Sequence, residues 1–95
     1  MFVISLRYIK PLAEVDLYIE GHISYLKKYY ANGTFIVSGR KEPRTGGVIL
    51  AKAENRKTLD EIITEDPFFE NGIAKYDITE FIPTMTAQGF DSLKS

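Results

Sequence analysis

The chain of 95 residues contains no cysteine and only one histidine, His22. Without cysteine there can be no disulfide bond, no thiolate metal site and no cysteine nucleophile. A single imidazole also argues against a metal centre built from histidines. No phosphate-binding loop or nucleophile elbow is present either. We therefore expect neither a metal nor an organic cofactor.

Neither sign of charge dominates the sequence. The 12 basic and 13 acidic side chains give a formal net charge of −1 at pH 7. Such a balance creates no broad positive field that would recruit nucleic acid or an anionic membrane surface. We therefore expect no nucleic-acid partner and no membrane partner.

Long apolar runs are also missing. No segment approaches the length that spans a bilayer, and residues 1–7 lack the basic start and long apolar core of a signal peptide. We expect a cytoplasmic protein. The length fits one small domain, which leaves much apolar surface uncovered unless it finds a partner.

Hydrophobic periodicity predicts four strands and two helices. The first helix is expected at about 13–32, ending at Gly33, and the second runs from a cap at Asn55 to near Glu65. The strands are expected at 2–9, 34–39, 46–52 and 74–82. From Thr84 onward the residues are mostly small or polar. We therefore expect a domain at 1–83 and a tail at 84–95.

This order of elements, βαββαβ, predicts an α+β ferredoxin-like fold, a four-stranded antiparallel sheet with two helices on one face. Two helices cover only one face of such a sheet. The opposite face is expected to carry Val3, Ile9, Ile36, Ile49 and Phe81. An uncovered apolar face predicts a second copy packed against it, so we expect a homodimer or a higher homo-oligomer.

The segment from Glu65 to Gly72 is the main candidate for a functional site. Pro67 disfavours helical geometry at Asp66, so the preceding helix should stop there. Asp66 can then cap a short helical turn that Pro67 begins and Gly72 closes in the left-handed conformation. One interpretation stops at this capping role, which stabilises by about 1 kcal/mol. The other makes Asp66 part of an acid/base site.

His22 lies on the apolar face of the first predicted helix. Histidine is the side chain best suited to proton transfer near neutral pH, and a carboxylate is the usual partner that fixes its tautomer. Asp66 is the candidate for that partner. The alternative is a core histidine that binds a backbone carbonyl or a tyrosine hydroxyl.

Three further residues are candidates for binding a substrate. Ser38 ends the second predicted strand and can present its hydroxyl to a pocket, although serine before glycine also suits an ordinary turn. Arg40 follows directly and can attract an anion, although charged loops are usually solvated. Arg7 stands within an apolar strand, and a buried arginine would need an anion or several acceptors.

Together these segments resemble the YciI-like family, also called the YCII-related domain. The resemblance covers about residues 1–83 and rests on the first strand and on the segments 21–26, 32–39, 65–69 and 72–73. It implies a ferredoxin-like fold that dimerises through its sheets as a dimeric α/β barrel. It also implies a His-Asp dyad, formed by His22 and Asp66, in a pocket. The family pattern often has proline after the small-residue–glycine pair, whereas Arg40 follows Gly39 here.

The leading hypothesis is a cofactor-independent enzyme that uses His22 and Asp66 for acid/base chemistry. The reaction would be that of a lyase, a dehydrohalogenase or an isomerase on a small anionic or aromatic compound. The alternative is a dimeric, non-catalytic domain that binds a small ligand or acts as an accessory domain. RNA binding on the sheet is a third possibility, but the strand at 46–52 has no aromatic residue on which bases could stack.

Overall fold

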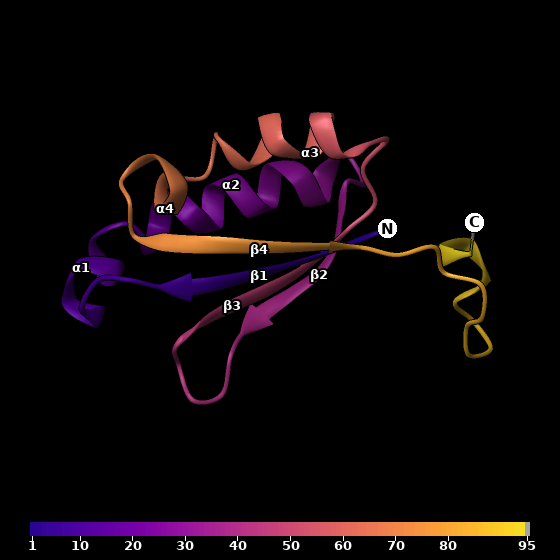
Figure 1. Ribbon diagram of the computed structural model, residues 1–95, viewed down its shortest axis with the longest axis horizontal. Helices are drawn as coiled ribbons and strands as arrows, with labels where there is room; N and C mark the ends of the chain where they lie inside the picture. Colours follow the sequence, from indigo (N-terminus) through magenta and orange to yellow (C-terminus); the bar gives the residue numbers. More distant parts are fainter. Residues whose placement is uncertain (95) are drawn as a thin grey trace.

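Four strands form one antiparallel sheet in the computed structural model, which describes residues 1–94 (Figure 1). They are β1 (Phe2–Tyr8), β2 (Phe35–Arg40), β3 (Gly46–Ala51) and β4 (Ala74–Glu80). Their order across the sheet is β2-β3-β1-β4. With the helical connections between β1 and β2 and between β3 and β4, this is the predicted ferredoxin-like arrangement.

The principal helices lie on one face of this sheet, as Figure 1 shows. They are α2 (Ile19–Ala31), α3 (Arg56–Ile63) and the short α4 (Pro67–Glu70), while α1 (Leu12–Leu17) lies at one end of the sheet. The single helix predicted at 13–32 is therefore wrong in one respect. Tyr18, with φ of −112° and ψ of 4°, departs from helical geometry and separates α1 from α2. Among residues 1–94, no helix has both the length and the apolar character that crossing a bilayer requires.

The core lies between the helices and the inner face of the sheet. Alternate residues of β1 point into it, and Phe2, Ile4 and Leu6 are almost completely buried. Burial of each such side chain is worth about 1.5–3 kcal/mol. The helices contribute the other half of the core, with Val15, Tyr25, Tyr29, Leu59, Ile62, Ile63 and Phe68.

The outer sheet face differs from the expectation in strands β2 and β3. Ile49 pairs with Ile4 and is 3% exposed, so its predicted place on the outer face is wrong. Residues directly opposite each other in an antiparallel pair share a face, which puts Leu50 outward with Val3. A bulge between Phe35 and Val37 shifts the register of β2, so Val37 rather than Ile36 faces outward opposite Leu50. We define the outer sheet face by Val3, Val37, Val48 and Leu50.

The chain after β4 leaves the sheet as an extended segment (Figure 1). Its large apolar residues are exposed, Met85 at 89% and Phe90 at 56%. A short 3₁₀ turn at Asp91–Leu93 follows, and the Lys52 ammonium donates a hydrogen bond to the carbonyl of Ser92 at 3.2 Å.

Candidate active site

Asp66 lies where α3 gives way to α4. Its side chain accepts a hydrogen bond from the backbone N–H of Phe68 at 3.0 Å, so it caps α4 as the sequence predicts. Pro67 occupies the first helical position and Gly72 takes the left-handed conformation with φ of +64°. The chain then turns directly into β4. These local features give Asp66 a fixed backbone.

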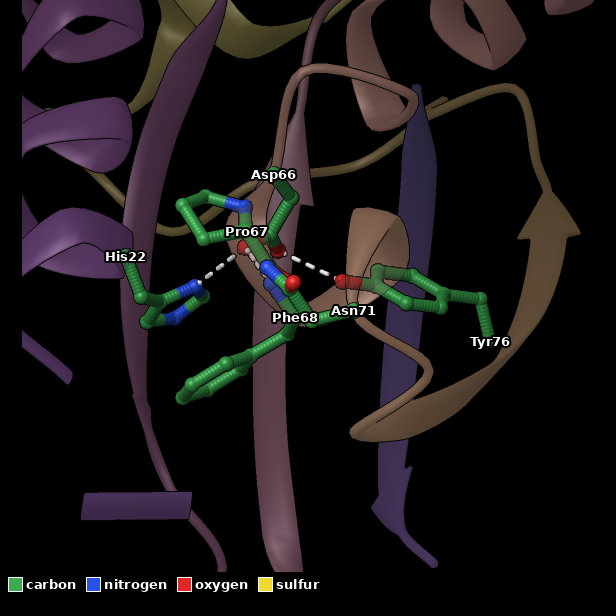
Figure 2. A network of polar contacts seen from close by, with 6 residues as sticks. All are labelled: His22, Asp66, Pro67, Phe68, Asn71 and Tyr76. Carbon is green, nitrogen blue, oxygen red and sulfur yellow. Dashed lines mark hydrogen bonds and ion pairs between the residues drawn. The ribbon is translucent and has the colours of Figure 1, made fainter. Parts of the chain in front are cut away.

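The Asp66 side chain is fully buried and has a donor on each carboxylate oxygen (Figure 2). Oδ1 accepts from Phe68 N–H and lies 2.8 Å from Nδ1 of His22. Oδ2 accepts from the hydroxyl of Tyr76 at 2.6 Å. Burying a carboxylate costs a great deal unless it is hydrogen-bonded. Three donors from three different elements supply that compensation here.

His22 projects from α2 and meets Asp66 through Nδ1, so the predicted contact between these two residues is present. A carboxylate anion can only accept, which assigns the proton to Nδ1 and leaves the lone pair on Nε2. No hydrogen bond to Nε2 occurs within residues 1–94. The imidazole also stacks on the ring of Phe68, with centroids 4.1 Å apart and planes 9° apart. Hydrogen bond and stacking together fix the ring's orientation.

A second set of contacts ties α2 to the segment just before Asp66. The Glu65 carboxylate accepts from Lys28 Nζ at 2.7 Å and from the hydroxyl of Tyr29. The hydrogen bond from Lys28 is the main reason why the pKa of Glu65 lies below its usual value. This ion pair is solvent-exposed, so it contributes little to stability.

His22 borders a cavity of about 310 Å³ that lies between α2 and strands β1 to β3. Its lining is mainly apolar, from Leu6, Ile19, Ile23, Leu26, Ile49 and Phe68. The polar side chains in the lining are Tyr8, His22, Ser38 and Arg40. The volume suits a small ring compound, and an apolar wall with few polar groups is typical of ligand pockets.

The structure brings two of the three predicted binding residues to this cavity. Ser38 lines it, and its Oγ is hydrogen-bonded to the hydroxyl of Tyr30. Arg40 lines it from the end of β2 and is solvent-exposed. Arg7 does not line it: it is exposed on the outer face, because Leu6 takes the inward position in β1. The structure therefore does not bring Arg7 to this cavity.

The sequence reasoning did not connect two tyrosines with Asp66. Tyr76 bonds the carboxylate directly, and Tyr25 is buried beside it at 7% exposure. Burial, followed by the nearby charge of Asp66, raises the pKa of both hydroxyls. The alternation of β4 placed Tyr76 on the half-buried face and was the available signal. No pattern identified Asp66 as its partner.

The described residues hold no group of three or more histidine, aspartate or glutamate side chains arranged as metal ligands would be. His22 and Asp66 form a pair only, and the donors around Asp66 already occupy its oxygens. The chemistry that this arrangement offers is proton transfer at Nε2 of His22.

Comparison with protein families gives a match to the YCII-related domain over residues 1–82. The chain belongs to this family. A search among curated proteins gives no significant match. Among solved structures, the YCII-related domain described here is similar to 5-chloro-2-hydroxyhydroquinone dehydrochlorinase (TftG) from Burkholderia phenoliruptrix AC1100, in complex with 2,5-dihydroxybenzoquinone. The TM-score is 0.68 and the identity 19%, over 85% of this chain and 93% of that chain. This likeness shows the ferredoxin-like fold.

Proposed function

We propose that this YCII-related domain is a cofactor-independent enzyme in which His22 and Asp66 act as a dyad. The observation that carries the proposal is the 2.8 Å contact between His22 Nδ1 and Asp66 Oδ1 at the border of the cavity. This contact leaves Nε2 of His22 available as a base at the border of the cavity, whose volume suits a small substrate. The substrate class is a small anionic or aromatic compound.

The proposed reaction begins with proton abstraction. Nε2 of His22 takes a proton from an acidic carbon or hydroxyl of the substrate, and the buried Asp66 carboxylate stabilises the imidazolium that forms. The electron pair left on the substrate then expels a leaving group, as in a lyase or dehydrohalogenase, or is reprotonated elsewhere, as in an isomerase. General base catalysis of this kind contributes on the order of 10²–10⁴ in rate.

Two features of the cavity support this chemistry. Its lining is mainly apolar, and electrostatic interactions are stronger in such low-polarity surroundings than in water. Arg40 is the one permanently charged side chain in the lining among the described residues, and it stands where it can attract an anionic group. TftG, by its name, removes hydrogen chloride from a chlorinated hydroxyhydroquinone. Loss of a proton and a chloride is a reaction that a base such as His22 would serve.

The experiment is an activity screen with chlorinated and unchlorinated hydroxyhydroquinones and with activated ring acids, followed by substitution of the dyad. We expect His22→Gln and Asp66→Asn each to lower kcat by a factor on the order of 10²–10⁴. Arg40→Gln should raise KM more than it changes kcat. Lys57→Gln removes an exposed charge on α3 and serves as the matched control. A His22→Gln variant with the full wild-type rate would overturn the proposal.

A non-catalytic ligand-binding domain is the second candidate, and the largely apolar lining favours it. In that case His22 supplies a hydrogen bond and transfers no proton. Isothermal titration with the same compounds separates the two functions. Binding that survives His22→Ala, together with no turnover of any compound by the wild type, would support the binding domain.

We also propose that two copies pair through the outer sheet face. Val37 is 56% exposed and Val48 is 39% exposed there, and the helices cover only the other face. Apolar patches of this kind are characteristic of interfaces. Analytical ultracentrifugation should show a dimer that Val37→Lys dissociates. Leu17→Lys, on an exposed position of α1, is the control that should leave the dimer intact. A wild-type monomer at micromolar concentration would contradict this pairing.

A further inference from the structure

A tyrosine hydroxyl lies on the side of the Asp66 carboxylate away from His22 (Figure 2). Tyr76 comes from β4, where it pairs with Leu6 and therefore faces the helices. Its hydroxyl is 2.6 Å from Oδ2 of Asp66. Its ring packs edge-on against Phe69, with centroids 5.7 Å apart. Asp66 thus lies between an imidazole on one oxygen and a phenol on the other.

We propose that Tyr76 is a positioning residue that fixes the plane of the Asp66 carboxylate and, through it, the tautomer and orientation of His22. The effect on the rate depends on the function proposed above. The effect on the imidazole does not, because it follows from the hydrogen bonds alone.

The physical reason lies in the terminal torsion of aspartate. Rotation of a carboxylate about its last bond has no sharp staggered minima, so packing preferences do not hold its plane. Phe68 N–H fixes one oxygen, Oδ1, but one contact still allows the group to rotate. Tyr76 is the only donor to Oδ2 within residues 1–94. With both oxygens held, a lone pair of Oδ1 stays aimed at Nδ1 of His22.

The Tyr76 hydroxyl remains a hydrogen-bond donor to Asp66. Its burial, followed by the charge of Asp66, raises the pKa of Tyr76, so it keeps its proton throughout the physiological range. A hydrogen bond to a charged carboxylate is also stronger than one between neutral groups. The chain Tyr76–Asp66–His22 therefore runs from β4 through the cap of α4 to α2, and it joins three elements at the cavity.

His22 is the only histidine of the chain, which makes the test direct. Its imidazole nitrogens give unambiguous signals in ¹⁵N NMR spectra, and these distinguish a proton on Nδ1 from one on Nε2. We expect the wild type to show the Nδ1–H tautomer. In Tyr76→Phe both tautomers should be present, and the Nδ1 proton should exchange with water about tenfold faster. The same variant should lose about tenfold in kcat with little change in KM.

Tyr29→Phe is the matched control. It also removes a partly buried tyrosine hydroxyl that donates to a carboxylate. That carboxylate belongs to Glu65, the residue next to Asp66. The His22 signals should keep their wild-type positions in this variant. If Tyr76→Phe is folded and shows wild-type tautomer and exchange, the positioning role is wrong.

Two further outcomes separate this inference from the proposed function. Altered His22 signals in Tyr76→Phe, with no substrate turned over even by the wild type, support the positioning role and count against the enzyme. If Tyr76→Phe does not fold, the test is the rate at which the Tyr76 hydroxyl proton of the wild type exchanges with water. A proton protected from exchange supports the inference, and one that exchanges as fast as that of a free tyrosine overturns it.

Discussion

A β-carbon added to Gly21 would lie 3.1 Å from Cγ of Pro67. Gly21 immediately precedes His22 in α2, and Pro67 immediately follows Asp66. The two backbones that carry the dyad therefore approach closely because position 21 has no side chain. A contact of 3.1 Å is tighter than carbon atoms prefer, so a larger residue would push α2 and α4 apart by a few tenths of an ångström.

The first prediction concerns Gly21→Ala. Alanine is favoured over glycine in an exposed helix interior by about 1 kcal/mol, so stability should change little or rise. Activity should nevertheless fall about tenfold, because small displacements at a reacting site are costly. Steady-state kinetics and urea unfolding measure the two effects. Pro67→Ala removes the opposing Cγ. The double variant Gly21→Ala/Pro67→Ala should therefore be more active than the sum of the two single effects predicts. Full activity of Gly21→Ala would show that this approach does not set the dyad distance.

The second prediction compares two helix caps. Asn55 caps α3 through a hydrogen bond from Thr58 N–H in an exposed setting, so Asn55→Ala should cost about 1 kcal/mol of unfolding free energy. Asp66→Ala also removes an acceptor from buried partners, and each unmatched donor costs about 1–3 kcal/mol more. Chemical denaturation measures both variants. Equal losses would mean that Asp66 stabilises the fold only as a cap.

The third prediction concerns the stacked ring beneath His22. Phe68 is 1% exposed and lies parallel to the imidazole. Phe68→Leu keeps an apolar side chain but removes the aromatic stacking, which is worth about 0.5–1.5 kcal/mol beyond buried area. Stability should fall by about that amount or somewhat more. The ¹⁵N signals of His22 should broaden as the ring gains freedom. Phe90→Leu, at a 56% exposed position in the C-terminal tail, is the comparison and should leave these signals sharp.

The fourth prediction is a loss of stability at alkaline pH. The folded state raises the pKa of Tyr25 and Tyr76 through burial and the charge of Asp66. An unfolded tyrosine loses its proton at about pH 10, so above that pH the unfolded state binds fewer protons than the folded one. These two tyrosines should therefore leave the unfolding free energy unchanged at about pH 7–9 and decrease it above about pH 10. Urea unfolding across this range tests it. Tyr76→Phe should weaken the decrease, and a decrease of wild-type size in this variant would contradict the prediction for Tyr76.

The sequence predicted most of the scaffold because the local signals agreed with the fold. Alternation in β1, the glycine after α2 and the Asp66–Pro67 pair each defined a boundary close to the observed one. Errors arose where tertiary context decided. A bulge in β2 changed which residues face outward, and period-two alternation alone cannot reveal a bulge. The break at Tyr18 likewise lies within a continuous apolar pattern.

The candidate site was predictable only in part for a related reason. Histidine and aspartate are conspicuous because few other residues here can transfer protons, so the contact of His22 with Asp66 could be anticipated. Tyr76 is one of six tyrosines, and nothing local distinguishes it. Its role depends on β4 lying beside α4 in the folded chain, which no local pattern reveals. Arg7 was named because an arginine in an apolar strand suggests burial, whereas its side chain is exposed in β1.

Because Oδ1 of Asp66 both caps α4 and lies 2.8 Å from Nδ1 of His22, the fold and the proposed chemistry share one atom. A descendant without the proposed activity would still need this aspartate to cap α4. The His22 side chain caps no helix, so it has no comparable role in the backbone structure. Among relatives, the residue aligned with position 22 is thus the more informative marker of retained reactivity, and an inert but well-folded version is best made there.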